Sequence, residues 1–114
     1  MKPNQIERLR RIKEFEFNQS LLRAHQIETM ISEFDRICID LGRQIEAEET
    51  RSRINDPTHF AYSTYAKAAR ERRSKLQRSA DSLRIELVTL RSTVRLEAND
   101  PLNSQFASTA SVAA

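Results

Sequence analysis

A chain of 114 residues with one glycine, three prolines and 31% charged residues has the composition of long helices, and little of it can form a thick core. The length allows one domain at most. No stretch approaches the roughly 18 consecutive apolar residues of a membrane span, and the N-terminus lacks the apolar core of a secretory signal. We therefore expect a cytoplasmic protein that does not span the membrane.

Apolar side chains recur in steps of three and four from residue 17 to residue 45, which predicts a long helix over about residues 4–53. The positions of this predicted seam are Phe17, Ser20, Ala24, Ile27, Ile31, Phe34, Cys38, Leu41 and Ile45.

The start of this first helix has a second apolar pattern that is out of phase with the seam. It is formed by Ile6, Leu9, Ile12 and Phe15, and it lies among basic residues that include Arg10 and Lys13. A second, shorter helix is predicted below over about residues 62–98, and this stretch extends past its end. We therefore predict that the stretch is an amphipathic docking face for another protein. An acidic lipid surface and a frayed helix end are the alternatives.

The heptads stop around Pro57, which cannot donate a helical backbone hydrogen bond, and we predict a turn over residues 54–61. Asp56 and Pro57 together have the residue types of a helix start. Ser63 or Thr64 could equally cap a later start. We favour a short turn followed by a main helix from about Tyr62.

A second heptad run predicts a helix over about residues 62–98. Its seam positions are Tyr62, Ala66, Ala69, Arg73, Leu76, Ala80, Leu83, Leu87, Leu90 and Val94. In an antiparallel pair the two residue numbers of each layer add up to a constant. A constant of 114 fits throughout, from Ile45 with Ala69 to Ala24 with Leu90, although a register shifted by a whole heptad would also mesh. Residues 1–98 are therefore predicted to form an all-α, two-helix antiparallel coiled-coil hairpin, with a parallel dimer as the rival. Residues 99–114, rich in Ser, Thr, Ala and Asn, are predicted to be a disordered tail.

Residue types for catalysis are scarce. His25 and His59 have no carboxylate pair, Cys-His spacing or glycine-rich phosphate loop beside them, and Cys38 is a small hydrophobe at a seam position. A two-stranded coiled coil also has no concave pocket that excludes water. We expect a protein that is not an enzyme and has no cofactor, metal or small-molecule substrate.

Basic residues concentrate just after the turn. They are Lys67, Arg70, Arg72, Arg73, Lys75 and Arg78, opposed within the same stretch only by Glu71. We predict a docking site for an acidic protein surface, with a solvated helix face and a nucleic-acid site as alternatives. Nucleic acid is disfavoured because no aromatic stacking platforms are interleaved with the basic residues. Glu49 is the expected partner of Arg70, and Arg73 is expected to fix the register of the seam.

The turn has a residue order that resembles a known family. Asp56-Pro57 is followed by His59-Phe60-Ala61-Tyr62 and then by Thr64-Tyr65-Ala66-Lys67-Ala68-Ala69. Between a long first helix and a basic second helix, this order resembles the flagellar export protein family FliJ as it occurs in alphaproteobacteria. The resemblance covers about residues 5–98, and it departs from the family at the C-terminus, where Asn99-Asp100-Pro101 ends the second helix early.

The resemblance implies a stalk-like hairpin of the flagellar type III export apparatus. Its implied partners are the hexameric export ATPase, the membrane export gate and export chaperones, and its implied place is the inner face of the cell membrane. The end with both termini would lie at the ATPase ring, and the Lys67–Arg78 stretch would face the gate or the chaperones. The alternatives are a general coiled-coil scaffold, a stalk of another secretion system, and a nucleic-acid-binding coiled coil.

Overall fold

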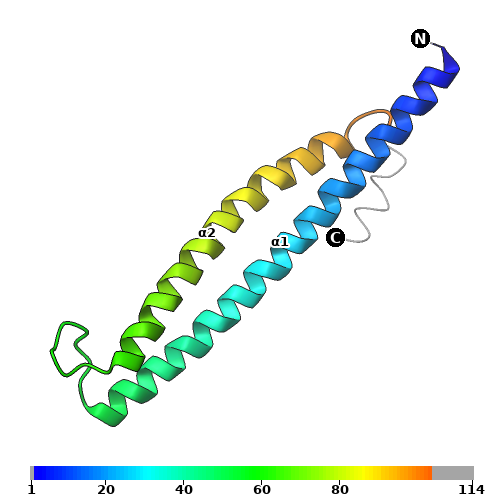
Figure 1. Cartoon of the computed structure of the whole chain (residues 1–114). Helices are drawn as coiled ribbons and strands as arrows, with labels where there is room; N and C mark the ends of the chain where they lie inside the picture. The colour runs from blue at the N-terminus through cyan, green and yellow to red at the C-terminus, as the bar shows by residue number, and fades with distance from the viewer. Residues whose placement is uncertain (1, 104–114) are drawn as a thin grey trace. The chain divides into compact units, whose positions relative to one another are not determined.

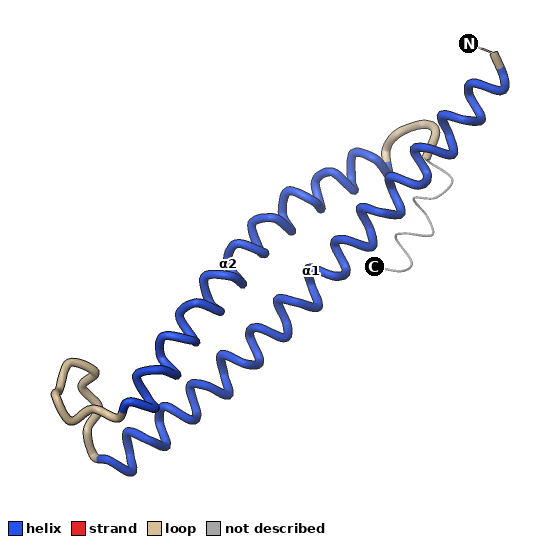
Figure 2. Tube along the Cα trace, in the orientation of Figure 1, coloured by secondary structure: helices blue, strands red, loops and turns tan. Residues whose placement is uncertain are grey.

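Two helices joined by one loop make up the fold. The computed structural model describes residues 2–103, in which α1 (Pro3–Ser52) is followed by α2 (Thr64–Ala98). The loop of residues 53–63 joins the end of α1 to the start of α2, and no strand occurs among residues 2–103 (Figures 1 and 2). The predicted all-α helical hairpin is confirmed, and both helices begin and end within two residues of the predicted positions.

The hairpin divides into two compact units. The terminal unit comprises Met1–Glu28 and Ile85–Ala114, and the turn unit comprises Thr29–Arg84. Within each unit, a segment of α1 packs antiparallel to a segment of α2. Each unit therefore contains its own part of the seam.

Local backbone chemistry sets the helix ends. Pro3 is the first residue of α1, a position where its missing N–H costs no helical hydrogen bond. The residue after α1, Arg53, has a φ of 60°, the left-handed conformation that commonly ends a helix. At the start of α2 the Ser63 hydroxyl accepts a hydrogen bond from the Ala66 N–H at 3.2 Å. Ser63 is thus the N-cap, so α2 begins at Thr64 and not at Tyr62.

The core is the predicted seam. Among residues 2–103, every buried hydrophobic side chain occupies a seam position. These side chains are Phe17, Ile27, Leu41, Ile45, Tyr62, Ala66, Ala69, Ala80 and Leu87. In the turn unit, Leu41, Ile45 and Ala69 form one cluster, against which Ile37 and Leu76 pack. Large side chains of α1 meet alanines of α2, so the two helices interdigitate.

Ion pairs along both flanks of the seam test the predicted register. In the turn unit the pairs are Arg70–Glu49 at 3.0 Å and Arg84–Asp35 at 2.5 Å, and in the terminal unit they are Arg91–Glu28 at 2.9 Å and Arg23–Glu86 at 3.0 Å. In each of the first three pairs, the two residue numbers add up to five more than the predicted layer total of 114. In the fourth pair they add up to five less. In the terminal unit the two flanks therefore lie symmetrically about the predicted layer total, and in the turn unit both pairs have the total of the same flank, which agrees with the predicted register. The three more exposed pairs, Arg84–Asp35, Arg91–Glu28 and Arg23–Glu86, specify register better than they stabilise, since each contributes about 0–1 kcal/mol.

The chain turns back immediately after α2. The Lys13 ammonium donates to Asp100 Oδ2 at 2.6 Å. Asn103 is only 1% exposed, and its side-chain amide donates to the backbone carbonyl of Glu97 at 3.2 Å. Residues 99–103 of the predicted disordered tail thus form turns with specific hydrogen bonds. The rest of that predicted tail, residues 104–114, lies outside the described residues.

Candidate partner-binding surfaces

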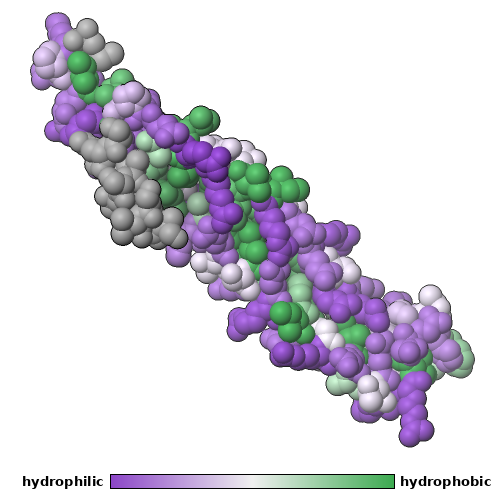
Figure 3. All heavy atoms as spheres, turned by 180° about the vertical axis from the view of Figure 1, so that it is seen from behind, coloured by the Kyte–Doolittle hydropathy of each residue, from purple (hydrophilic) through white to green (hydrophobic). Residues whose placement is uncertain are grey.

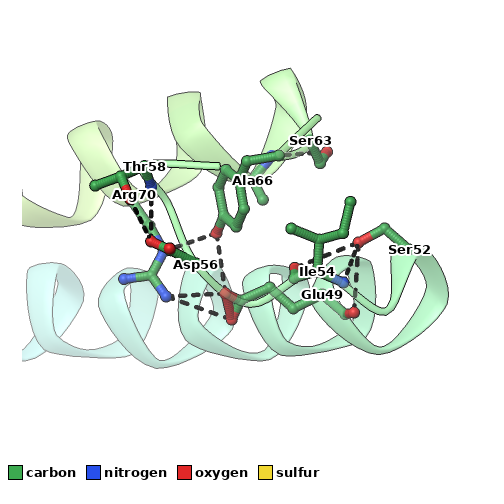
Figure 4. Close-up of polar contacts among 9 residues, drawn as sticks. Glu49, Ser52, Ile54, Asp56, Thr58, Ser63, Ala66 and Arg70 are labelled. Atoms are coloured by element: carbon green, nitrogen blue, oxygen red, sulfur yellow. Dashed lines mark hydrogen bonds and ion pairs between the residues drawn. The ribbon is translucent and has the colours of Figure 1, made fainter. Parts of the chain in front are cut away.

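The loop is held by a series of local hydrogen bonds (Figure 4). The Asp56 carboxylate accepts from the backbone N–H of Thr58 at 2.9 Å and from its hydroxyl at 2.7 Å. His59 Nδ1 accepts from the Ala61 N–H at 3.0 Å. The Thr58 bonds hold the pKa of Asp56 below its ordinary value. Asp56 therefore shapes the turn by an Asx-type contact and does not cap α2.

A polar network fastens the start of α2 to the end of α1 (Figure 4). The Tyr62 hydroxyl donates to Glu49 Oε2 at 3.0 Å and accepts from Arg70 Nε at 2.8 Å, while Arg70 Nη2 also donates to Glu49 Oε2 at 3.0 Å. The predicted pairing of Glu49 with Arg70 is present. The hydrogen bond from Arg70, with a smaller effect from Tyr62, holds the pKa of Glu49 below its ordinary value against the opposing effect of burial. The Glu49 carboxylate is therefore ionised and structural.

The predicted basic residues do not share one face. Lys67, Arg72, Lys75 and Arg78 are exposed, whereas Arg70 is half-buried in the network with Glu49. Arg70, Lys75 and Arg78 line a shallow hollow together with Glu71 and Ser74. Because the Glu71 carboxylate and the Ser74 hydroxyl lie in the same hollow, this surface has mixed charge and is less basic than the stretch looks in sequence.

Arg72 borders a different hollow, between the two helices of the turn unit. Leu41, Ala68 and Ala69 contribute apolar surface there, and Gln44 and Tyr65 lie beside it. The Tyr65 hydroxyl donates to Gln44 Oε1 at 2.9 Å. Because the side chains of α2 are small here, this groove is open. A partner molecule that carries an apolar group next to a carboxylate has suitable chemistry to enter it.

Arg73 is half-buried at its seam position. Its guanidinium lies over Gly42, the one glycine of the chain, and a Cβ at that glycine would lie 3.4 Å from Arg73 Nη1. The Cys38 thiol donates to the Arg73 carbonyl at 3.8 Å. Arg73 therefore belongs to the helix contact and not to the exposed basic surface in which the sequence places it. Its role in fixing the register stays a prediction.

The predicted docking face at the start of α1 is partly exposed. Ile6, Ile12 and Phe15 are 42%, 48% and 64% exposed, and Leu9 is half-buried. Two of its cations have acidic neighbours in the chain. Arg10 pairs with Glu7 at 2.8 Å and Lys13 pairs with Asp100 at 2.6 Å, which raises the pKa of the Lys13 ammonium. Arg10 and Lys13 are therefore partly neutralised within the chain, whereas Arg8 and Arg11 of the same stretch are exposed.

Sequence patterning missed two exposed apolar features. Phe60 is 96% exposed and stacks on the His59 ring, with centroids 4.7 Å apart. On α2, Leu96, Ile85 and Val88 are 74%, 71% and 68% exposed, and none of the three occupies a seam position. Figure 3 shows one face of the molecule, on which apolar side chains reach the surface in separate patches among hydrophilic ones. An apolar residue outside the heptad phase is the sequence signal for such surfaces.

Neither α1 nor α2 contains a stretch apolar enough to cross a bilayer. Residues 2–103 also contain no cluster of three His, Cys, Asp or Glu side chains that could hold a metal ion. Comparison with models of known protein families, with curated proteins and with solved structures finds no match to this chain.

Proposed function

We propose that this chain is a non-catalytic adaptor of flagellar type III export, a helical hairpin that couples the export ATPase to the export gate and to export chaperones. The observation that carries the proposal is the residue order from Asp56 to Ala69, which resembles the FliJ family. The hairpin fold supports it, because this is the fold that the resemblance implies.

The structure gives many residues of that order a part in the turn. Asp56 shapes the loop, Tyr62 joins Glu49 to Arg70, and Ala66 and Ala69 pack in the seam. Phe60 and Lys67 are exposed, and neither is part of the buried seam. A shared need to build this turn therefore accounts for much of the resemblance, and the exposed residues are the ones available for a partner.

Partner binding on α2 would depend on several weak charge contacts. Lys67, Arg72, Lys75 and Arg78 are exposed, and no ion pair within residues 2–103 engages any of them. Because a single exposed ion pair contributes only about 0–1 kcal/mol, an acidic partner must engage several of these cations at once. Binding should therefore weaken as salt screens the charges.

The direct experiment uses the purified chain with a cognate export ATPase and with the cytoplasmic domain of the gate protein. We expect binding to both and faster ATP hydrolysis by the ATPase. Charge reversal by Arg72→Glu with Lys75→Glu should weaken one of the two complexes. The matched control reverses Arg36 and Arg43, two exposed arginines of α1. The proposal is contradicted if the unmodified chain binds neither the ATPase nor the gate domain.

The exposed cations of α2 also favour one rival, a nucleic-acid binder. That function predicts binding to a DNA or RNA duplex that collapses between about 50 and 200 mM salt, because each neutralised phosphate releases counterions. A salt titration with a fluorescent duplex separates the two functions. Duplex binding without any binding to the ATPase or the gate would replace the flagellar proposal.

A further inference from the structure

We propose that an outer row of α2, formed by Ile85, Val88, Ser92 and Leu96, is a contact surface for a second copy of this chain, paired antiparallel to the first. These residues are three, four and four positions apart, a spacing that places them on one stripe of a helix. Ile85, Val88 and Leu96 are 71%, 68% and 74% exposed. This proposal does not depend on the flagellar function.

This part of α2 has apolar side chains on two sides. Leu87 is 7% exposed in the seam with α1, whereas Ile85 and Val88 on the outer side are mostly exposed. A surface helix of a two-helix hairpin needs only one apolar stripe, which faces its partner helix. The second stripe is explained if another helix packs on the outer side.

The polar groups beside the outer row are satisfied by the helix itself. The Thr89 hydroxyl donates to the Ile85 carbonyl at 3.4 Å, and the Thr93 hydroxyl donates to the Thr89 carbonyl at 3.2 Å. Hydroxyls bonded in this way leave threonine methyl groups available for contact. Covering these threonines would therefore not leave their hydroxyls without a partner.

Charges beside the row are largely compensated within the chain, which favours a copy of the chain as the occupant. Arg91 pairs with Glu28 at 2.9 Å and Glu86 pairs with Arg23 at 3.0 Å, both in the terminal unit. Arg95 remains as an exposed cation at one end of the row. A surface with so little net charge offers a strongly acidic partner or lipid little attraction, and it repels its own copy only weakly.

The position of Arg95 favours the antiparallel orientation. Arg95 lies at one end of the outer row. Parallel pairing would set it beside Arg95 of the copy, whereas antiparallel pairing separates these two cations. Antiparallel pairing also sets Ile85 against Leu96 of the copy and Val88 near Ser92 of the copy, so that the small serine leaves room at the centre.

The experiment measures self-association of the full chain by sedimentation velocity. A single stripe is a small interface, so we expect a weak dimer that becomes populated below roughly 1 mM chain. Val88→Glu should weaken the dimer roughly tenfold or more, because it buries a charge without a partner. Val88→Ala keeps helix propensity and should weaken the dimer less. The matched control is Ile39→Glu, which alters another exposed apolar residue of the chain, 57% exposed on α1, and should leave the dimer unchanged.

A chain that stays monomeric up to roughly 1 mM, or a dimer that Val88→Glu leaves intact, overturns the proposal. Disulfide trapping tests the orientation in a Cys38→Ser background. Mixing an Ile85→Cys chain with a Leu96→Cys chain should give the mixed disulfide. Disulfides formed only between two Ile85→Cys chains would overturn the antiparallel arrangement.

Discussion

Tyr62→Phe removes one hydroxyl from the network that fastens the start of α2 to the end of α1. That hydroxyl donates to Glu49 at 3.0 Å and accepts from Arg70 at 2.8 Å, so the variant loses two hydrogen bonds to charged groups. The Glu49 carboxylate keeps its bond to Arg70 at 3.0 Å and is not left unpaired. Buried bonds to charged groups contribute about 1.5–3 kcal/mol each, but water can replace part of this contribution, because the Arg70 side chain is 34% exposed. We expect the free energy of unfolding to fall by about 1 kcal/mol.

Urea unfolding followed by far-UV circular dichroism measures this loss, and Tyr65→Phe is the matched control. The Tyr65 hydroxyl makes one neutral hydrogen bond to Gln44, and Tyr65 is 58% exposed. Its removal should cost less than about 0.5 kcal/mol. If the two variants lose equal stability, or if Tyr62→Phe loses none, the network does not hold the hairpin end and the reasoning fails.

Three further predictions concern the hairpin itself. The pKa of Glu49 in the folded chain lies below its ordinary 4.5, so the ionised carboxylate stabilises the fold above about pH 4.5. This stabilisation is lost as the pH falls through the pKa of the folded state. Glu49→Gln should therefore flatten the decrease of melting temperature on acidification. Ile27→Ala empties a fully buried seam position and should cost about 2–4 kcal/mol in urea unfolding, and a loss below 1 kcal/mol would contradict the seam. Arg53→Gly should stabilise by about 0.5–1 kcal/mol, because glycine adopts a positive φ without strain, and a lower urea midpoint would refute this.

The heptads predicted most of the fold because a long hairpin has one simple requirement, a continuous apolar seam in matching phase. Ile27 and Leu41 are buried where the periodicity places them, and Ala80 takes a small-residue position opposite large residues. The pairing of Glu49 with Arg70 was also predictable, since flank positions follow directly from the register.

Other features depend on local geometry that periodicity does not contain. Ser63, Thr64 and Asp56 all have capping residue types, and only the three-dimensional turn shows that Ser63 caps α2. The bond from Lys13 to Asp100 joins residues far apart in sequence, and no repeat relates them.

The most direct test of the adaptor proposal is genetic, in the organism that carries this chain. Deleting the gene should abolish or strongly reduce flagellar filament assembly and swimming, and the unmodified chain should restore both. The variant in which Lys67, Arg72, Lys75 and Arg78 are all changed to Glu should accumulate as a folded protein and fail to restore them. A deletion strain that assembles normal filaments and swims normally would contradict the proposed function.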